Sequence, residues 1–280
     1  MRFLRSLRRR RLRLQVHDSP CEESQPHLVC HLLRHRRHHR HLFRRMLKKI
    51  IHETNFTLPE LDVNPESDLL VFDKPYKCTS FDLVNKVRHT IQRQANRKIK
   101  VGHAGTLDPL ATGVLIICVG KMTKQIDTIQ AQTKEYTGTI RVGGTTASFD
   151  LEHPVDQEYP YEHITREMAE EVAQRFVGNI QQVPPLFSAV KLGGVRAYEF
   201  AREGTEQQIA AKDITIYGFE ITRFELPDID FRINCSKGTY IRSIARDYGK
   251  ALHSGAHLTA LRRTRIGDYL VENAIKPIIL

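Results

Sequence analysis

The chain has 280 residues, of which 40% are hydrophobic and 27% are charged, a composition typical of a globular protein. Its five cysteines form no CxxC pair and follow no regular spacing, which argues against a zinc ribbon or a disulfide framework and fits a reducing compartment. No apolar run approaches the roughly 20 residues that a membrane-spanning helix needs, so these features exclude an integral membrane protein.

The net charge of +11 is concentrated at the N-terminus. Residues 1–50 contain 15 Lys and Arg but only three Asp and Glu, together with seven of the 14 histidines. The other 230 residues contain 28 basic and 29 acidic groups and are close to neutral. The overall charge therefore does not by itself make the body of the protein a nucleic-acid binder, and only local clustering of basic residues could do so.

Residues 1–50 are low in complexity and self-repelling, and we expect them to be a disordered basic extension. Three interpretations remain open: an arm that contacts RNA, an organelle transit peptide, or a start codon placed upstream of Met46. Asp18, Glu22 and Glu23 count against a transit peptide. We therefore expect a cytoplasmic protein, with an organelle as the alternative if residues 1–45 are a transit peptide. The His-rich tract lacks spaced Cys or carboxylate partners, so we predict no metal site.

A polar linker is predicted over residues 51–68, and a single folded domain over residues 69–280. The apolar run Leu69–Phe72 predicts a buried strand. A turn then leads to a helix that Thr79 caps, with Asp82 completing a T-x-x-D capping motif. Four apolar residues at helical spacing predict its buried stripe: Phe81, Val84, Val87 and Ile91.

The rest of the domain alternates irregularly between strands and helices. Strands are predicted over residues 114–119, 135–142, 214–225 and 229–235, the last two joined by a turn at Pro227 and Asp228. One helix is predicted around Met168, Val172 and Phe176, and another from near Thr239 to Gly255. Because there is no strict βαβ rhythm, we expect an α+β domain with a mixed, mostly antiparallel central sheet flanked by helices.

The segment GHAGTLDPLATG, residues 102–113, is the densest candidate site. Asp108 precedes Pro109, which pushes its backbone out of the helical region, and the loop leads into a buried strand. A carboxylate fixed at the end of a rigid strand suits a catalytic group, although an isolated Asp-Pro is more often only a turn.

A second candidate site follows at Tyr136, which lies on a predicted strand with Gly138 on the same face. The glycine would leave room for a flat partner to stack on the tyrosine ring, but a packed core tyrosine is equally consistent with the pattern. Asp150, at the end of this segment, is either a turn residue or a polar contact.

Two stretches of the near-neutral body are strongly basic, residues 74–100 and 232–265, with eight Lys and Arg each. In the second stretch, Arg242 and Arg246 lie one turn apart on the predicted helix, opposite its apolar stripe. Arg262 and Arg263 follow Leu261. Such an uneven charge distribution is what a phosphate-binding face requires, although a solvated helix surface would give the same pattern.

Several of these segments together resemble the TruB family of tRNA pseudouridine synthases. The resemblance rests on LLVFDKP, GHAGTLDPLATGVL, KEYTGTIRVG, PPLFSAVKLGGVRAYEFAREG and CSKGTYIRSIARDYG followed by GAHLTALRR, in this order and at family-like spacing. It extends from about Leu69 to Tyr269. Many members carry a C-terminal PUA domain, for which this chain leaves no room after the motifs, so we expect the short form.

The resemblance implies a role for each candidate residue. Asp108 would be the catalytic aspartate, Tyr136 the ring that stacks on the target uracil, and Arg242 the ion-pair partner of Asp108. Leu261 would form an apolar wall of the pocket, and His103 would contact RNA beside the flipped nucleotide. RNA-binding roles are also expected, less firmly, for five further residues: Lys74, Asp150, Arg246, Arg262 and Arg263.

The family converts uridine-55 in the T loop of tRNA to pseudouridine without cofactor or metal. The resemblance therefore predicts an isomerase whose partner is the T-arm of tRNA. We expect it to be a monomer that needs no membrane and no obligate protein partner. Two alternatives remain: a noncatalytic tRNA-binding folding chaperone, and a synthase that acts on another RNA. The sequence does not choose between attack at the ribose C1′ and at uracil C6.

Overall fold

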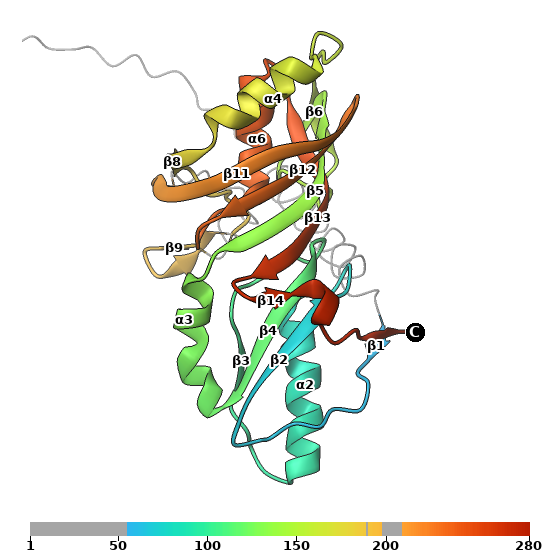
Figure 1. The fold of residues 1–280 in the computed structure, drawn as a ribbon, viewed down its shortest axis with the longest axis vertical. Coiled ribbons are helices and arrows are strands. Elements are labelled where there is room, and N and C mark those ends of the chain that lie inside the picture. The colour runs from blue at the N-terminus through green and yellow to red at the C-terminus, as the bar shows by residue number, and fades with distance from the viewer. Residues whose placement is uncertain (1–54, 189, 198–208) are drawn as a thin grey trace, which may run out of the picture. The chain divides into compact units, whose positions relative to one another are not determined.

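The computed structural model describes residues 55–188, 190–197 and 209–280. The predicted basic extension, residues 1–50, lies outside the described residues. Within them, the chain forms four α-helices and one large sheet with the strand order β2-β4-β13-β5-β12-β11-β8 (Figure 1). Every pair along this path is antiparallel except β4 with β13, so the predicted α+β fold with a mixed, mostly antiparallel sheet is confirmed.

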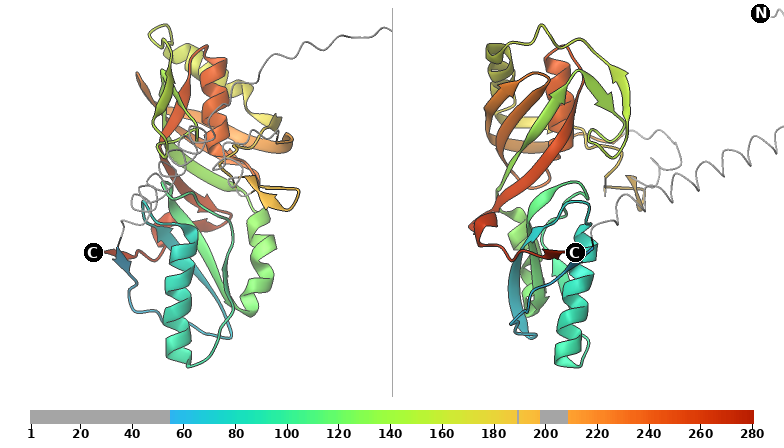
Figure 2. Two further views of the ribbon diagram at one scale, coloured as in Figure 1. Left: turned by 180° about the vertical axis from the view of Figure 1, so that it is seen from behind. Right: turned by 90° about the vertical axis from the view of Figure 1, so that its right-hand side faces the viewer.

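One half of the sheet is built around β4 (Thr112–Gly120), whose seven central residues are buried. It pairs with β2 (Ser67–Lys74) and with the short β3 (Val101–His103). Helix α2 (Ser80–Ala95) lies along this half of the sheet (Figure 1 and Figure 2). Its buried residues Leu83, Val84, Val87 and Ile91 belong to the same core as β2 and β4. The continuous apolar run in β4 therefore reflects a strand that is covered on both faces.

The other half contains β5 (Lys134–Val142), β12 (Asp228–Cys235), β11 (Lys212–Glu225) and β8 (Gly178–Gln182). Helix α4 (Arg166–Arg175) and helix α6 (Ile241–Ala251) pack on these strands. The predicted apolar face of α6 is confirmed, since each of its predicted members is buried: Ile241, Ile244, Ala245, Tyr248 and Leu252. The two helices thus close one continuous core.

Strand β13 (Ala256–Ile266) joins the two halves of the sheet. The sequence pattern predicted no strand in this region. Strand β13 runs antiparallel to β5 along most of its length and meets β4 in parallel at Arg262 and Arg263. The loop before β4 and the end of β13 therefore lie beside each other, although about 150 residues separate them in the sequence.

Shorter elements complete the fold: α3 (Ile126–Ala131), β1 (Phe56–Thr57), β6 (Gly144–Thr146), β7 (Val155–Glu158), β9 (Lys191–Leu192), β10 (Val195–Arg196), β14 (Tyr269–Leu270), β15 (Ile278–Ile279), and 3-10 turns at Lys121–Gln125 and Val271–Asn273. Strand β1 pairs with β15, near the C-terminus of the chain.

The structure differs from two sequence-based predictions. The described part of the expected linker, residues 55–68, is packed rather than free, because Phe56 and Leu61 are buried in the core under α2. In α2 itself, Phe81 is 59% exposed and Leu83 takes its place in the buried stripe. Position 83 lies one residue before Val84 and on the same face as Val87, whereas Phe81 lies on the solvent side.

The capping motif at the start of α2 forms as predicted. The Thr79 hydroxyl accepts a hydrogen bond from the backbone N–H of Asp82, and the Asp82 carboxylate accepts one from the backbone N–H of Thr79. These bonds satisfy two donors that the first helical turn would otherwise leave unpaired.

Replacing Thr79 by alanine is therefore expected to lower the free energy of unfolding by about 1 kcal/mol. Thr79→Ser keeps the hydroxyl and should lose much less. Chemical denaturation followed by circular dichroism measures both, and equal stabilities of the two variants would contradict the capping role.

Candidate active site

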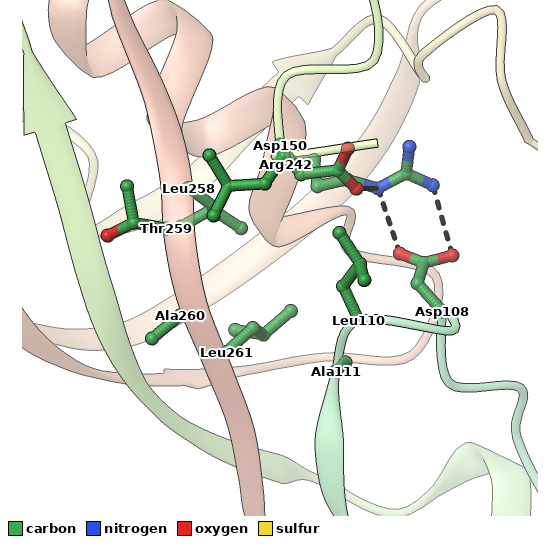
Figure 3. Close-up of a pocket in the computed structure, with 10 residues that line it drawn as sticks. Asp108, Leu110, Ala111, Asp150, Arg242, Leu258, Thr259, Ala260 and Leu261 are labelled. Atoms are coloured by element: carbon green, nitrogen blue, oxygen red, sulfur yellow. Dashed lines mark hydrogen bonds and ion pairs between the residues drawn. The ribbon is translucent and has the colours of Figure 1, made fainter. Parts of the chain in front are cut away.

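The segment GHAGTLDPLATG forms the connection between β3 and β4, with Asp108 near its middle. The Asp108 carboxylate makes a bidentate ion pair with Arg242 of α6, as Figure 3 shows. The Arg242 Nε lies 2.8 Å from one carboxylate oxygen, and its Nη2 lies 3.0 Å from the other. The side chain of Asp108 is 36% exposed while that of Arg242 is only 5% exposed. The carboxylate therefore faces solvent with a buried cation behind it.

Arg242 is held from several sides. Its Nη1 donates a hydrogen bond to the backbone carbonyl of Ser148 at 3.1 Å, and its Nη2 donates to that of Phe187 at 3.0 Å. Burial lowers the pKa of Arg242, but Asp108 and Asp150 more than offset this and hold it above the usual value. The sequence pattern predicts Arg242 on the face of its helix opposite the apolar stripe, exposed to solvent. This prediction is wrong, because every residue in the first turn of α6 is buried.

Asp150 is a second carboxylate beside the same guanidinium, 3.7 Å from Arg242 Nε. It is buried, and one of its oxygens accepts hydrogen bonds from the Ser148 hydroxyl and from the backbone N–H of Glu152. Burial raises the pKa of Asp150, while Arg242 and Ser148 oppose that rise. The sequence left open whether Asp150 is a turn residue or a polar contact, and it is the latter.

A pocket opens beside the ion pair (Figure 3). Apart from Asp108, Asp150 and Arg242, its wall is mostly apolar and consists of Leu110, Ala111, Leu151, Leu258, Thr259, Ala260 and Leu261. Leu261 thus lies in the pocket wall, where the resemblance placed it. A mostly apolar lining with a few polar groups is the usual form of a small-substrate site.

Lys74, expected to bind RNA, is completely buried and does not reach the surface. Its ammonium donates hydrogen bonds to the backbone carbonyls of Pro75 at 2.8 Å, Cys78 at 2.5 Å and Pro109 at 3.3 Å. Burial lowers the pKa of Lys74 to about 8. Pro109 follows Asp108 in the sequence. Lys74 therefore holds the loop that carries Asp108 from inside the protein, where it cannot contact a phosphate.

Arg263, also expected to bind RNA, is 2% exposed and likewise holds the loop. Its guanidinium donates hydrogen bonds to the backbone carbonyls of Gly105, Thr106 and Val114 at 2.8–3.3 Å. At Gly113 a Cβ atom would lie 2.1 Å from the Arg263 carbonyl, so only glycine allows β4 and β13 to approach this closely.

Arg262 and Arg246 are nearer the surface. Arg262 makes an ion pair with Asp73, with N–O distances of 2.7 and 3.0 Å, and donates a hydrogen bond to the Thr112 hydroxyl at 3.2 Å. Arg246 pairs with Asp247 and lies 4.9 Å from the ring centre of Phe149. Both side chains retain partial exposure, so an RNA-binding role for them stays a prediction.

Tyr136 lies on β5 directly opposite Arg263 of β13 and is 8% exposed. Burial raises the pKa of its hydroxyl, and the neighbouring Arg263 guanidinium opposes that rise. The sequence suggested open space beside Gly138, but the structure fills it. A Cβ there would lie 2.4 Å from the Ala260 carbonyl and 3.0 Å from the Phe231 ring. Stacking of the ring on a substrate therefore stays a prediction.

His103 ends β3, just before the catalytic loop. Its side chain is partly buried, and its Nδ1 has no hydrogen-bond partner within the structure. Burial, with a smaller contribution from Arg263, lowers the pKa of the imidazole. Because this unpaired Nδ1 is itself buried, it is not open to RNA in the structure, and the RNA contact of His103 stays a prediction.

Sequence reasoning missed Ser148 and Phe187, whose carbonyls orient Arg242, and Ser80, whose hydroxyl bonds to both the N–H and the carbonyl of Leu107. Backbone acceptors carry no side-chain signature, so no motif pointed to the first two. The proximity of Ser148 to Asp150 in the sequence was the only available signal.

Within the described ranges, no group of three His, Cys, Asp or Glu residues is placed to hold a metal ion, and no helix there is long and apolar enough to cross a membrane. What the residues do provide is a partly exposed carboxylate with a fixed cation at the edge of an apolar pocket. Such a carboxylate is suited to nucleophilic attack or to proton transfer.

The adjacent arginines of β13 allow a matched stability test. Arg263→Met removes a buried side chain's hydrogen bonds to three backbone carbonyls and should lower the free energy of unfolding by about 3 kcal/mol. Arg262→Met removes only a partly exposed ion pair and should cost less than about 1 kcal/mol. Urea denaturation of both variants measures the difference, and equal losses would contradict the buried role of Arg263.

Comparison with known proteins agrees with this geometry. A protein of Flavobacterium johnsoniae named tRNA pseudouridine synthase B is 56% identical over 212 residues, which are 75% of this chain and 93% of the relative. A protein of Phocaeicola vulgatus with the same name is 57% identical over 211 residues, covering 75% of this chain and 90% of the relative.

Solved structures give the same result for the fold. A crystal structure of a Cbf5-Nop10-Gar1 complex matches with a TM-score of 0.54 and 27% identity, covering 80% of this chain and 61% of the matched chain. An H/ACA RNP bound to a substrate RNA containing 2'-deoxyuridine matches with a TM-score of 0.52 and 25% identity, covering 80% of this chain and 60% of that chain.

The family model described as TruB family pseudouridylate synthase (N terminal domain) matches residues 92–241, more than half of the chain. This range contains Asp108, Tyr136 and Asp150, and Arg242 follows it directly. With relatives of this identity and coverage, the chain belongs to the TruB family of pseudouridine synthases.

Proposed function

We propose that this protein converts uridine-55 in the T loop of tRNA to pseudouridine, with Asp108 as the catalytic group. The observation that carries the proposal is the bidentate pairing of Asp108 with buried Arg242 at the edge of an apolar pocket. The relatives named tRNA pseudouridine synthase B support tRNA as the substrate.

The target uridine must leave its loop before the carboxylate can reach it. Turning a nucleotide out of an RNA loop costs a few kcal/mol of unstacking free energy, which base-flipping enzymes recover by binding the everted base. Asp108 then attacks the nucleoside, at C1′ or at uracil C6, as its glycosidic N1–C1′ bond breaks. Arg242 favours the charged carboxylate that this attack requires.

Once its bond to the ribose has broken, the uracil has to turn and rejoin C1′ through C5 before water can intervene. The bond to Asp108 is then broken, C5 loses its proton and N1 gains one, so that the carboxylate is regenerated. Leu110, Leu258 and Leu261 provide an apolar wall against which the ring can turn. We propose that Tyr136 stacks on the uracil and assists removal of the C5 proton.

Asp150 argues against hydrolysis. A glycosidase uses two carboxylates on opposite sides of the bond that breaks. Here Asp108 and Asp150 contact the same guanidinium, and one Asp150 oxygen already accepts two hydrogen bonds. Asp150 therefore helps to fix Arg242 and is not placed to activate water independently.

We further propose that the protein acts on the T-arm as a cytoplasmic monomer without an obligate protein partner. In support of a reducing compartment, the three cysteines of the described part are free thiols. A noncatalytic tRNA chaperone and a synthase for another RNA are the alternatives. Mapping pseudouridine across total RNA after removal of the gene separates all three.

Asp108→Asn should abolish pseudouridine formation and leave tRNA binding nearly unchanged, because the amide is nearly isosteric but is not a nucleophile. Release of tritium from C5-labelled uridine in tRNA measures turnover, and filter binding measures affinity. A variant that still turns over would refute the assignment of Asp108.

Arg242→Lys keeps a positive charge in the buried site but cannot pair with both Asp108 oxygens. We expect kcat to fall by about 100-fold, since small displacements of a catalytic group cost about that much, while KM changes by less than about threefold. Steady-state kinetics with T-arm RNA measure both constants. A parallel loss in KM would indicate a phosphate contact instead of a positioning role.

A further inference from the structure

An exposed aromatic ring lies next to the catalytic loop on a part of the surface that the proposed mechanism does not use. Phe81 is 59% exposed, more than any other phenylalanine among the described residues. It occupies the first turn of α2. A large apolar side chain turned to solvent at such a place indicates a binding partner more strongly than scattered surface residues do.

Phe81 is accompanied by a cation. The Arg88 guanidinium carbon lies 5.8 Å from the centre of the Phe81 ring, two turns along the same face of the helix. Arg88 is oriented by hydrogen bonds to the Asn85 side chain at 2.8 Å and to the Val101 carbonyl at 3.2 Å. Neither partner is an acid, so the positive charge of Arg88 is not neutralised by these contacts.

The same arrangement recurs at the turn before the helix. The ring of Tyr76 is 44% exposed, and the Lys77 Nζ lies 5.9 Å from its centre. The surface formed by Tyr76, Lys77, Phe81 and Arg88, here called the aromatic–basic surface, thus combines two π faces with two cations. This combination is typical of surfaces that bind unpaired nucleotides.

This surface is held at a fixed position relative to the catalytic carboxylate. Ser80, which precedes Phe81, is hydrogen-bonded through its hydroxyl to Leu107, which precedes Asp108, at 2.9 and 3.0 Å. Arg88 contacts Val101 at the start of β3, the strand that ends at His103. Ser80 and Arg88 therefore fix α2 to the two ends of the segment that leads to Asp108.

We propose that the aromatic–basic surface binds substrate RNA beside the everted uridine, with an unpaired base stacked on Phe81 and a backbone phosphate on Arg88. This inference rests on the proposed function, because it requires a substrate RNA at Asp108. The ring supplies a stacking partner that tolerates any base, and the guanidinium supplies the charge that a phosphate needs.

The test compares Phe81→Leu with Phe81→Trp, since leucine keeps an apolar side chain but cannot stack. With a T-arm stem-loop, Phe81→Leu should raise KM and Kd about 5- to 150-fold, the range that loss of one stacked base gives. The value of kcat should stay within about twofold of the wild-type value, and Phe81→Trp should stay within about threefold in all constants. Tyr217→Leu, which alters a 56% exposed ring on β11, serves as the matched control and should change nothing.

Unchanged KM and Kd in Phe81→Leu would overturn the inference, as would an equal loss in Phe81→Leu and Phe81→Trp. Phe81 is exposed, so all variants should fold, which thermal unfolding verifies. Failure of the proposed function gives a different result: the wild-type chain would then form no pseudouridine in the same RNA, whatever the affinities of the variants.

Discussion

The site depends on one buried guanidinium. Arg242 contacts Asp108 on the loop before β4, Asp150 after β6, and the backbone carbonyls of Ser148 and Phe187. Segments spread from residue 108 to residue 242 therefore converge on a single side chain. A buried charge is costly unless it is paired and hydrogen-bonded, and here two carboxylates and two carbonyls meet that requirement. The same contacts that stabilise the cation also fix the Asp108 carboxylate in place.

Two more buried cations extend this principle to the rest of the loop. Lys74 binds the carbonyl of Pro109, and Arg263 binds those of Gly105, Thr106 and Val114. A loop that must present a carboxylate to solvent cannot bury much apolar surface of its own. Its backbone carbonyls accept hydrogen bonds instead from Lys74 of β2 and Arg263 of β13, on the side of the loop that faces the protein interior. These bonds make the loop rigid without closing the pocket.

The sequence predicted best those features that depend on local pattern. The capping motif at Thr79, the continuous apolar run of β4 and the apolar face of α6 each carry their own signal, and the structure confirms them. Strand β13 was missed because buried polar residues such as Arg263 interrupt its apolar pattern, and two register shifts reset its alternation. The basic stretches predicted a phosphate-binding face, yet Lys74 and Arg263 are buried. Counting charges does not distinguish a cation that faces solvent from one that binds backbone carbonyls.

Strand β13 explains how the pocket and the loop remain in register. Successive side chains of a strand point to opposite faces, so Leu261 and Arg263 share one face and Arg262 takes the other. Leu261 lines the pocket, while Arg263 holds the loop that carries Asp108. A shift of β13 by one residue would move both functions to the wrong face at once. The parallel contact with β4, where Gly113 admits the Arg263 backbone, prevents this shift and fixes the spacing between Asp108 and the apolar wall.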